Sequence, residues 1–344
     1  MRRPSWLPDS FVLTLAALVL LASVLPVRGE AARWAGWVTN ATIALLFFLH
    51  GAKLSFAAVL QGLAHWRLHG FVLGVTFVGF PLLGWAAQPL LLPLIGADLT
   101  RGVLYFCVLP STVQSAIALT SMARGNVSAA VCGAAVSSLL GVFLTPALVL
   151  LLLGAAVQGI DFGQALARVV VQLLLPFVAG QLARRCIGAW VDAHRAVLKH
   201  VDQSSIYLVI YTAFSKAVVD GIWQQLPAQR LLLLVLVCVV VLAIALAACH
   251  WATGRLGFAI EDRITALFGG SQKSLATGVP IAQVLFTGGS MGALLLPLMI
   301  YHQVQLMTCA ALARRFQRRA VGATAVAAPG ASPGSRDCAP GGTP

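Results

Sequence analysis

The chain has 344 residues, of which 59% are hydrophobic and only 10% are charged, and its mean hydropathy is +0.91. Soluble domains carry about 25% charged residues, so this composition excludes a water-soluble globular protein and indicates a protein embedded in lipid. The net charge is +13, but the basic residues are scattered over loop positions rather than gathered on one face. This pattern predicts contact with anionic membrane lipids and no nucleic-acid partner.

Ten segments of the chain are apolar and long enough to cross a bilayer, which takes about 20 residues. They are residues 10–27, 34–52, 70–94, 101–122, 127–153, 164–187, 204–221, 230–253, 261–286 and 291–313. The first follows two arginines, as a signal peptide would, but the similar segments after it favour a retained membrane helix. Residues 188–203 are too polar to span, and we expect them at the cytoplasmic interface. Residues 320–344, rich in Ala, Pro and Gly, are expected to form a disordered tail.

The basic residues orient these spans. If the N-terminus is cytoplasmic, sixteen of the 23 Lys and Arg residues fall on the cytoplasmic side, five fall outside, and Lys216 and Lys273 fall within spans. Cytoplasmic loops carry such an excess of positive residues. An even number of spans places both termini in the cytoplasm, and we expect the protein in the inner membrane of a bacterium.

Two of the spans contain a polar interruption. Span four reads "LPSTVQSAIALT" over 109–120, and span nine reads "FGGSQKSLATG" over 268–278. A helix breaker precedes a glutamine in each: Pro110 before Gln114, and Gly269 and Gly270 before Gln272. Unpaired backbone groups and a charge are costly in hydrocarbon, so they are tolerated where protein or a water-filled cavity surrounds them.

The interruptions suggest an internal repeat. The next span in each case contains a proline, Pro146 or Pro297, so residues 1–153 and 164–313 resemble two copies of one five-span unit. Because five is odd, the second copy must insert upside down, as in the inverted repeats of secondary transporters. The sequence thus predicts an all-α polytopic membrane protein of ten transmembrane helices, with broken helices 4 and 9 crossing at mid-membrane. The substrate- and ion-binding residues are predicted to be Ser111, Thr112, Gln114, Ser115, Ser271, Gln272, Lys273 and Ser274.

Six stretches carry a resemblance to a known family. They are "LLFFLHGAKLS" (45–55), "HWRLHGFVLGVTFVGFPLLG" (65–84), "LPSTVQSAIALTSMARGNVSAAV" (109–131), "FLTP" (143–146), "FGGSQKSLATGVPIAQVLF" (268–286) and "LPLMIYHQVQL" (296–306). In these the chain resembles the bile acid:sodium symporter family, most closely its SBF-like branch within the cation:proton antiporter superfamily. The resemblance implies a core domain of spans 3–5 and 8–10, a panel domain of spans 1, 2, 6 and 7, and relative movement of the two.

The chain departs from the sodium-coupled members at the ion site. Where they carry a glutamate in span nine, this sequence has Gln272 and Lys273, and where they place hydroxyls in span five it has Ala130 and Ala134. Sodium and the proton therefore both stay candidates for the coupling ion, and no other cofactor or metal is expected. The Lys273 ammonium can replace a bound cation, exchange protons, pair with an anionic substrate, or extend to the membrane interface.

The expected function is secondary active transport of a small, anionic organic solute. The alternative is a non-transporting regulatory membrane protein that keeps the transporter fold. An intramembrane enzyme is disfavoured, because the ten acidic residues lie at span ends or in loops. The substrate and the oligomeric state are not given by the sequence.

Overall fold

The computed structural model describes residues 10–53, 65–153, 162–221, 226–286 and 291–326, and every regular element in these ranges is a helix. Six helices are long and apolar enough to cross a membrane: Gly29–Lys53, Trp66–Ile95, Val127–Leu153, Ala167–Ala193, Ala228–Arg255 and Met291–Arg318. The chain is therefore an all-α polytopic membrane protein, as the composition predicts. Many large apolar side chains lie exposed on these helices, among them Trp37, Leu151 and Leu232, and suit contact with lipid.

In chain order the helices are α1 (Ser10–Val24), α2 (Gly29–Lys53), α4 (Trp66–Gly74), η2 (Val75–Gly79), α5 (Phe80–Ile95), α6 (Ala97–Cys107), α7 (Gln114–Met122), α8 (Val127–Leu153), α9 (Phe162–Val169), η4 (Val170–Leu174), α10 (Leu175–Ala193), α11 (Arg195–Val219), α13 (Ala228–Arg255), α14 (Ile260–Ser271), α15 (Leu275–Leu285) and α16 (Met291–Val326). Helix α16 continues past residue 320, where the tail was predicted to begin, and residues 327–344 lie outside the described ranges.

Two long helices contain a π-helical turn two residues before a proline. Elements α4, η2 and α5 are continuous, and so are α9, η4 and α10. A proline removes one backbone donor and its ring crowds the preceding turn, so a wider turn accommodates it without ending the helix. In each case the proline, Pro81 or Pro176, is the second residue after the π turn.

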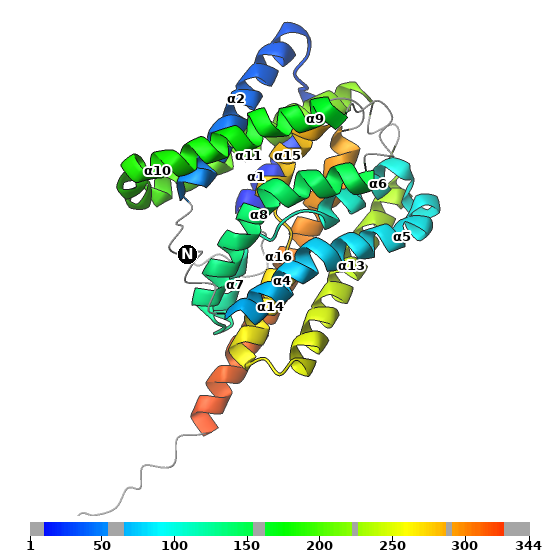
Figure 1. Ribbon diagram of the computed structural model, residues 1–344. Coiled ribbons are helices and arrows are strands. Elements are labelled where there is room, and N and C mark those ends of the chain that lie inside the picture. The colour runs from blue at the N-terminus through cyan, green and yellow to red at the C-terminus, as the bar shows by residue number, and fades with distance from the viewer. Residues whose placement is uncertain (1–9, 54–64, 154–161, 222–225, 287–290, 327–344) are drawn as a thin grey trace, which may run out of the picture.

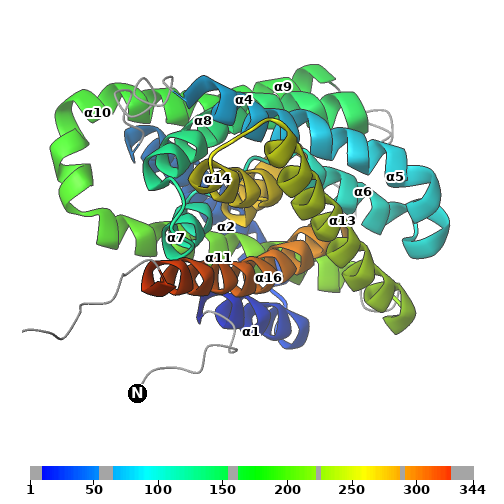
Figure 2. The same cartoon turned by 90° about the horizontal axis from the view of Figure 1, so that it is seen from below.

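The helices form two groups (Figure 1). Helix α2 packs along α10 and α1 packs along α11, whereas α6 packs on α16 and α13 packs on α14. Seen from below, α14 lies among α4, α7, α8 and α13 (Figure 2), and each of these helices contacts it. Helix α11 joins the two groups through its contacts with α15 and α16.

Helices α2 and α10 approach so closely that their backbones touch. A Cβ atom at Gly180 would lie 1.9 Å from the carbonyl oxygen of Phe48, and one at Gly51 would lie 2.0 Å from that of Phe177. Any larger residue at either glycine would force the helices apart, which is the usual reason for small residues at membrane-helix interfaces.

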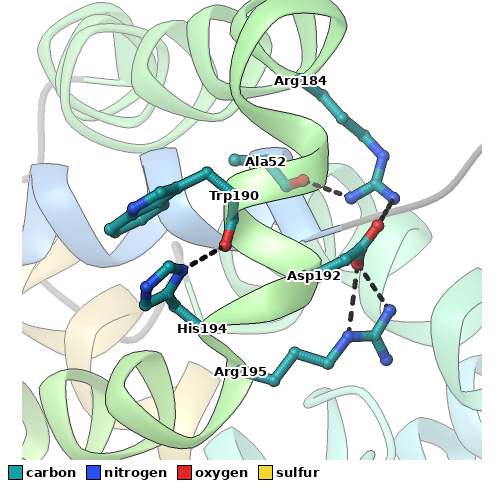
Figure 3. Close-up of polar contacts among 6 residues, drawn as sticks. All are labelled: Ala52, Arg184, Trp190, Asp192, His194 and Arg195. Atoms are coloured by element: carbon teal, nitrogen blue, oxygen red, sulfur yellow. Dashed lines mark hydrogen bonds and ion pairs between the residues drawn. The ribbon is translucent and has the colours of Figure 1, made fainter.

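Residues 188–203 form the end of α10, a turn and the start of α11. Asp192, near the end of α10, bonds Arg184 at 3.0 Å and Arg195 at 2.6 Å (Figure 3). The Arg184 guanidinium also donates to the carbonyl oxygen of Ala52. His194, at the turn, uses its Nδ1 to bond Trp190 O at 2.9 Å. These contacts connect the turn between α10 and α11 to the end of α2.

Candidate functional site

The chain leaves the helical conformation at both predicted interruptions. The first break covers residues 108–113, between α6 and α7, and the second covers 272–274, between α14 and α15. The two breaks are bonded to each other, because the amide of Ser274 donates to Pro110 O at 2.9 Å. Two segments more than 150 residues apart thus share one polar centre.

A side-chain network joins the breaks a second time. The Oε1 atom of Gln272 accepts hydrogen bonds from the hydroxyl of Thr112 and, at 2.8 Å, from that of Ser115. The hydroxyl oxygens of Thr112 and Ser115 lie 2.6 Å apart, so either proton can be shared between the other hydroxyl and the Gln272 oxygen. Gln272 is fully buried, and its Nε2 group has no hydrogen-bond partner among the described residues.

The prediction that Gly269 and Gly270 break the second helix is wrong. Both lie inside α14, which continues to Ser271. They are needed for packing: a Cβ at Gly270 would lie 3.0 Å from Cys249 Sγ on α13, and one at Gly269 would lie 3.4 Å from Val72 on α4. Small residues bring α14 close to its neighbours, and the helix ends after them.

Lys273 is the middle residue of the second break and is fully buried. Its ammonium donates to three backbone carbonyls: Thr76 O at 2.9 Å, Cys107 O at 3.0 Å and Leu109 O at 2.8 Å. Cys107 is the last residue of α6 and Leu109 follows it, so these carbonyls carry the partial negative charge of a helix C-terminus. The ammonium also lies 4.1 Å from the centre of the Phe80 ring, a favourable cation–π position.

The surroundings of Lys273 decide which of its expected contacts are present. The side chain does not extend to a membrane interface, since it is 0% exposed. Among the described residues no acidic side chain pairs with it. All its hydrogen-bond partners are oxygens that can only accept, so three bonds require the three N–H groups of the charged ammonium.

Helix α16 binds the second break from its other side. Gln305 accepts a bond from the Lys273 amide at 2.8 Å and donates one to the Lys273 carbonyl at 2.9 Å. Tyr301 donates to Ser271 O at 2.7 Å. His302 bonds Gln305 at 2.9 Å and so fixes the orientation of its amide. The Ser271 carbonyl and both backbone groups of Lys273 are therefore satisfied by protein, as a low-dielectric environment requires.

Helix α8 supplies hydrogen-bond partners for the backbone of the first break. The hydroxyl of Thr145 donates to Val108 O at 3.0 Å, and the hydroxyl of Ser137 accepts from the Ser111 amide at 3.1 Å. Thr145, Ser137, Tyr301 and Gln305 are not among the residues predicted for the site. The available signal was a polar side chain inside an apolar span, which usually marks a function or a specific partner.

The remaining predicted site residues lie apart from the Thr112–Gln272 network. Ser271 bonds back to Leu267 O of its own helix at 2.6 Å, and Ser274 caps α15 by accepting from the Thr277 amide at 3.2 Å. Gln114 is exposed at the start of α7. The hydroxyl of Ser111 lines a separate cavity.

The fold and this site define a class of protein: a polytopic membrane protein with two interrupted helices whose breaks meet in its interior. Residues 9–318 match a family model described as "SBF-like CPA transporter family". The chain belongs to this family, in agreement with the resemblance seen in the sequence.

Three relatives extend this result. The chain is 55% identical to "Uncharacterized protein PA2026" of Pseudomonas aeruginosa, over 93% of this chain and 96% of that protein. It is 50% identical to "Putative symporter YfeH" of Escherichia coli, over 90% and 93% of the two chains. It is 29% identical to "Sodium/bile acid cotransporter 7" of Rattus norvegicus, over 89% and 90%.

Proposed function

We propose that this protein is a secondary active transporter that carries a small, anionic organic solute by alternating access. In the proposed arrangement ten spans form two inverted five-helix repeats, spans four and nine are the broken ones, and both termini face the cytoplasm of a bacterium. The family membership and the names of the relatives, a putative symporter and a bile acid cotransporter, support transport of this kind.

The observation that carries the proposal is the junction of the two breaks. Ser274 bonds Pro110 across it, and Thr112 and Ser115 bond Gln272. In secondary transporters, paired interrupted helices at corresponding places in two repeats mark the binding site, because their free helix ends offer dipoles and backbone groups to a solute.

Lys273 has a structural role in this proposal: its ammonium takes the place of a bound cation. Backbone carbonyls at a helix end are typical ligands of a bare monovalent cation, and three of them bind the ammonium here. A fixed ammonium would repel a sodium ion at the same point. The coupling ion, whether sodium or the proton, would then bind elsewhere.

Alternating access would move one helix group against the other. The pair α2–α10 is held together by its glycine contacts, and the bonded breaks hold α6, α7, α14 and α15 together. Each group would move as a unit, with the solute bound where the broken helices face the other group.

Uptake into proteoliposomes under separate sodium and proton gradients tests the proposal. The solutes are radiolabelled bile acids and smaller organic carboxylates, and protein-free vesicles and the Lys273→Ala variant are controls. We expect at least one anion to accumulate under one of the gradients and to do so far less with Lys273→Ala. If neither gradient drives any anion across, the regulatory alternative is favoured instead.

A further inference from the structure

A polar cavity adjoins the first break, among helices α4, α7, α8 and α14. Its free volume is about 10 Å³, about enough for a single water molecule. Its polar lining is His69 from α4, Ser111 from the break, Thr120 from α7 and Thr265 from α14, and each of these is more than nine-tenths buried. The other residues that α7 and α8 place on the wall are alanines and one glycine, so the space between the helices is left open. We call this space the His69 cavity.

Two hydroxyl groups show that the His69 cavity is built for a polar occupant. The Oγ atom of Ser111 and the Oγ1 atom of Thr120 are buried and have no hydrogen-bond partner among the described residues. Leaving such a group without a partner costs about 1–3 kcal/mol, so it is usually satisfied by water or a ligand. Thr265 donates its proton to Glu261 O at 2.9 Å, and its oxygen can still accept a bond.

The lining determines the chemistry of that occupant. It contains no carboxylate, so a metal cation would be bound by neutral oxygens only. It contains no lysine or arginine, so an organic anion would not be neutralised there. His69 is the titratable side chain of the lining, and an imidazole can take up a proton by itself. Neighbouring hydroxyl oxygens can accept a bond from the added N–H, directly or through a water molecule.

The charged groups on the surrounding helices have other partners or lie outside the lining. On α4, Arg67 donates to Leu256 O at 3.2 Å. On α14, Asp262 accepts from Asn126 at 2.9 Å, and neither Glu261 nor Arg263 is part of the lining. Helix α7 has no titratable side chain, Cys132 of α8 is not part of the lining, and Lys273 bonds three carbonyls.

We propose that the His69 cavity is the proton-binding site of this transporter, with His69 as the group that takes up the proton. The proposal rests on the proposed function and adds the coupling ion to it. Ser111 connects the site to the broken helices, because its hydroxyl lines the cavity while its amide bonds Ser137 within the first break. A proton bound here would offset the negative charge of the solute, which would otherwise be costly to carry across the membrane.

Proton uptake by His69 can be measured without any substrate. The purified protein, labelled with ¹³C in its histidine rings, is titrated in lipid nanodiscs and followed by NMR. The signal that is absent from His69→Gln belongs to His69, and His65→Gln, an exposed histidine one turn away, is the matched control. We expect the His69 signal to change from the neutral to the protonated form between about pH 5 and 8. We also expect its midpoint to move in Thr120→Val. The proposal is overturned if the His69 signal keeps one form over this range, or if its midpoint is the same in Thr120→Val as in the wild-type protein.

A transport assay distinguishes an error in the His69 proposal from an error in the proposed function. In proteoliposomes, His69→Gln should reduce the stimulation of anion uptake by a pH gradient by about tenfold or more, and His65→Gln should leave it unchanged. If uptake responds to the pH gradient equally in both variants, transport stands and the His69 site is overturned. If the wild-type protein carries no anion, the proposed function fails, and the NMR titration still decides whether His69 binds a proton.

Discussion

Two lysines with well-defined partners differ in how their charge is compensated. Lys273 is fully buried, and its ammonium bonds the backbone oxygens of Thr76, Cys107 and Leu109. Lys53 is the last residue of α2, its side chain is 25% exposed, and it forms an ion pair with Asp202 of α11. The charge in the interior is compensated by peptide dipoles that no mutation can remove, whereas the charge at the helix end is compensated mainly by one carboxylate, with a longer contact of 3.4 Å to the carbonyl oxygen of Leu198.

The comparison indicates what each lysine does. A buried ion pair can be replaced by two neutral side chains with little loss, because both charges disappear together. The carbonyls around Lys273 cannot be neutralised in that way, so they need a cation. Replacing each lysine by a neutral residue tests this difference.

Lys273→Met should have the largest effect. It leaves buried carbonyls of the first break and of η2 without a donor, and we expect a loss of about 3 kcal/mol or more in the free energy of unfolding. The thermal unfolding midpoint in detergent measures the loss. A variant that unfolds within about one degree of the wild-type protein would contradict the role of the ammonium, since a loss of about 3 kcal/mol should lower the midpoint of a chain of this length by about 4 °C.

Gln305→Leu should have the next largest effect. It removes the partner of both the amide and the carbonyl of Lys273, and two buried groups left without bonds cost about 2–4 kcal/mol together. Met307→Leu, at an exposed position on the same helix, is the matched control and should unfold as the wild type does. Equal midpoints for the two variants would show that α16 does not stabilise the second break.

Thr112→Val should be milder. Gln272 Oε1 would lose one donor and keep the other, Ser115, so we expect a loss of about 1 kcal/mol in the same unfolding measurement. Combining Thr112→Val with Ser115→Ala should cost more than the sum of the single variants, because the second change leaves the oxygen with no donor. If the losses of the two single variants simply add in the double variant, Gln272 Oε1 is not a shared acceptor for the two hydroxyls.

The double variant Lys53→Met/Asp202→Asn should have the smallest effect. Lys53→Met leaves a mostly buried carboxylate unpaired, and we expect Asp202→Asn to recover most of the lost stability, to within about 1 kcal/mol of the wild type. High salt should weaken the partly exposed ion pair between Lys53 and Asp202, and it should leave the bonds of the buried Lys273 ammonium unchanged. If the double variant is less stable than Lys53→Met, Asp202 has a further role.

The sequence predicts the positions of the two breaks better than their contacts. Pro110 and the run of polar residues around Gln272 mark the interruptions, because such residues are costly in a continuous membrane helix. Small residues have two uses, however, and Gly269 and Gly270 serve close packing instead of a break. Local sequence does not distinguish these uses.

The partners of Lys273 could not be predicted from the sequence. They are backbone oxygens 164 to 197 residues away, and a backbone oxygen leaves no mark in the sequence. The role of Gln305 likewise depends on how α16 packs against the second break. The structure brings Thr112, Ser115 and Gln272 into hydrogen-bond contact, each a polar residue beside an interruption, and their role in binding stays a prediction.

The most direct test of the central claim is chemical rescue of Lys273→Ala. The lost atoms from Cγ to Nζ correspond to n-propylammonium, which can return the cation to the carbonyls of Thr76, Cys107 and Leu109. We predict that n-propylammonium raises the unfolding temperature of Lys273→Ala in a saturable manner. A neutral alcohol of the same size, n-propanol, should not raise it. Lys273→Met should not respond to n-propylammonium, because its side chain fills the space. If n-propylammonium leaves Lys273→Ala unchanged, or shifts all variants equally, the crossing does not depend on a cation at this position.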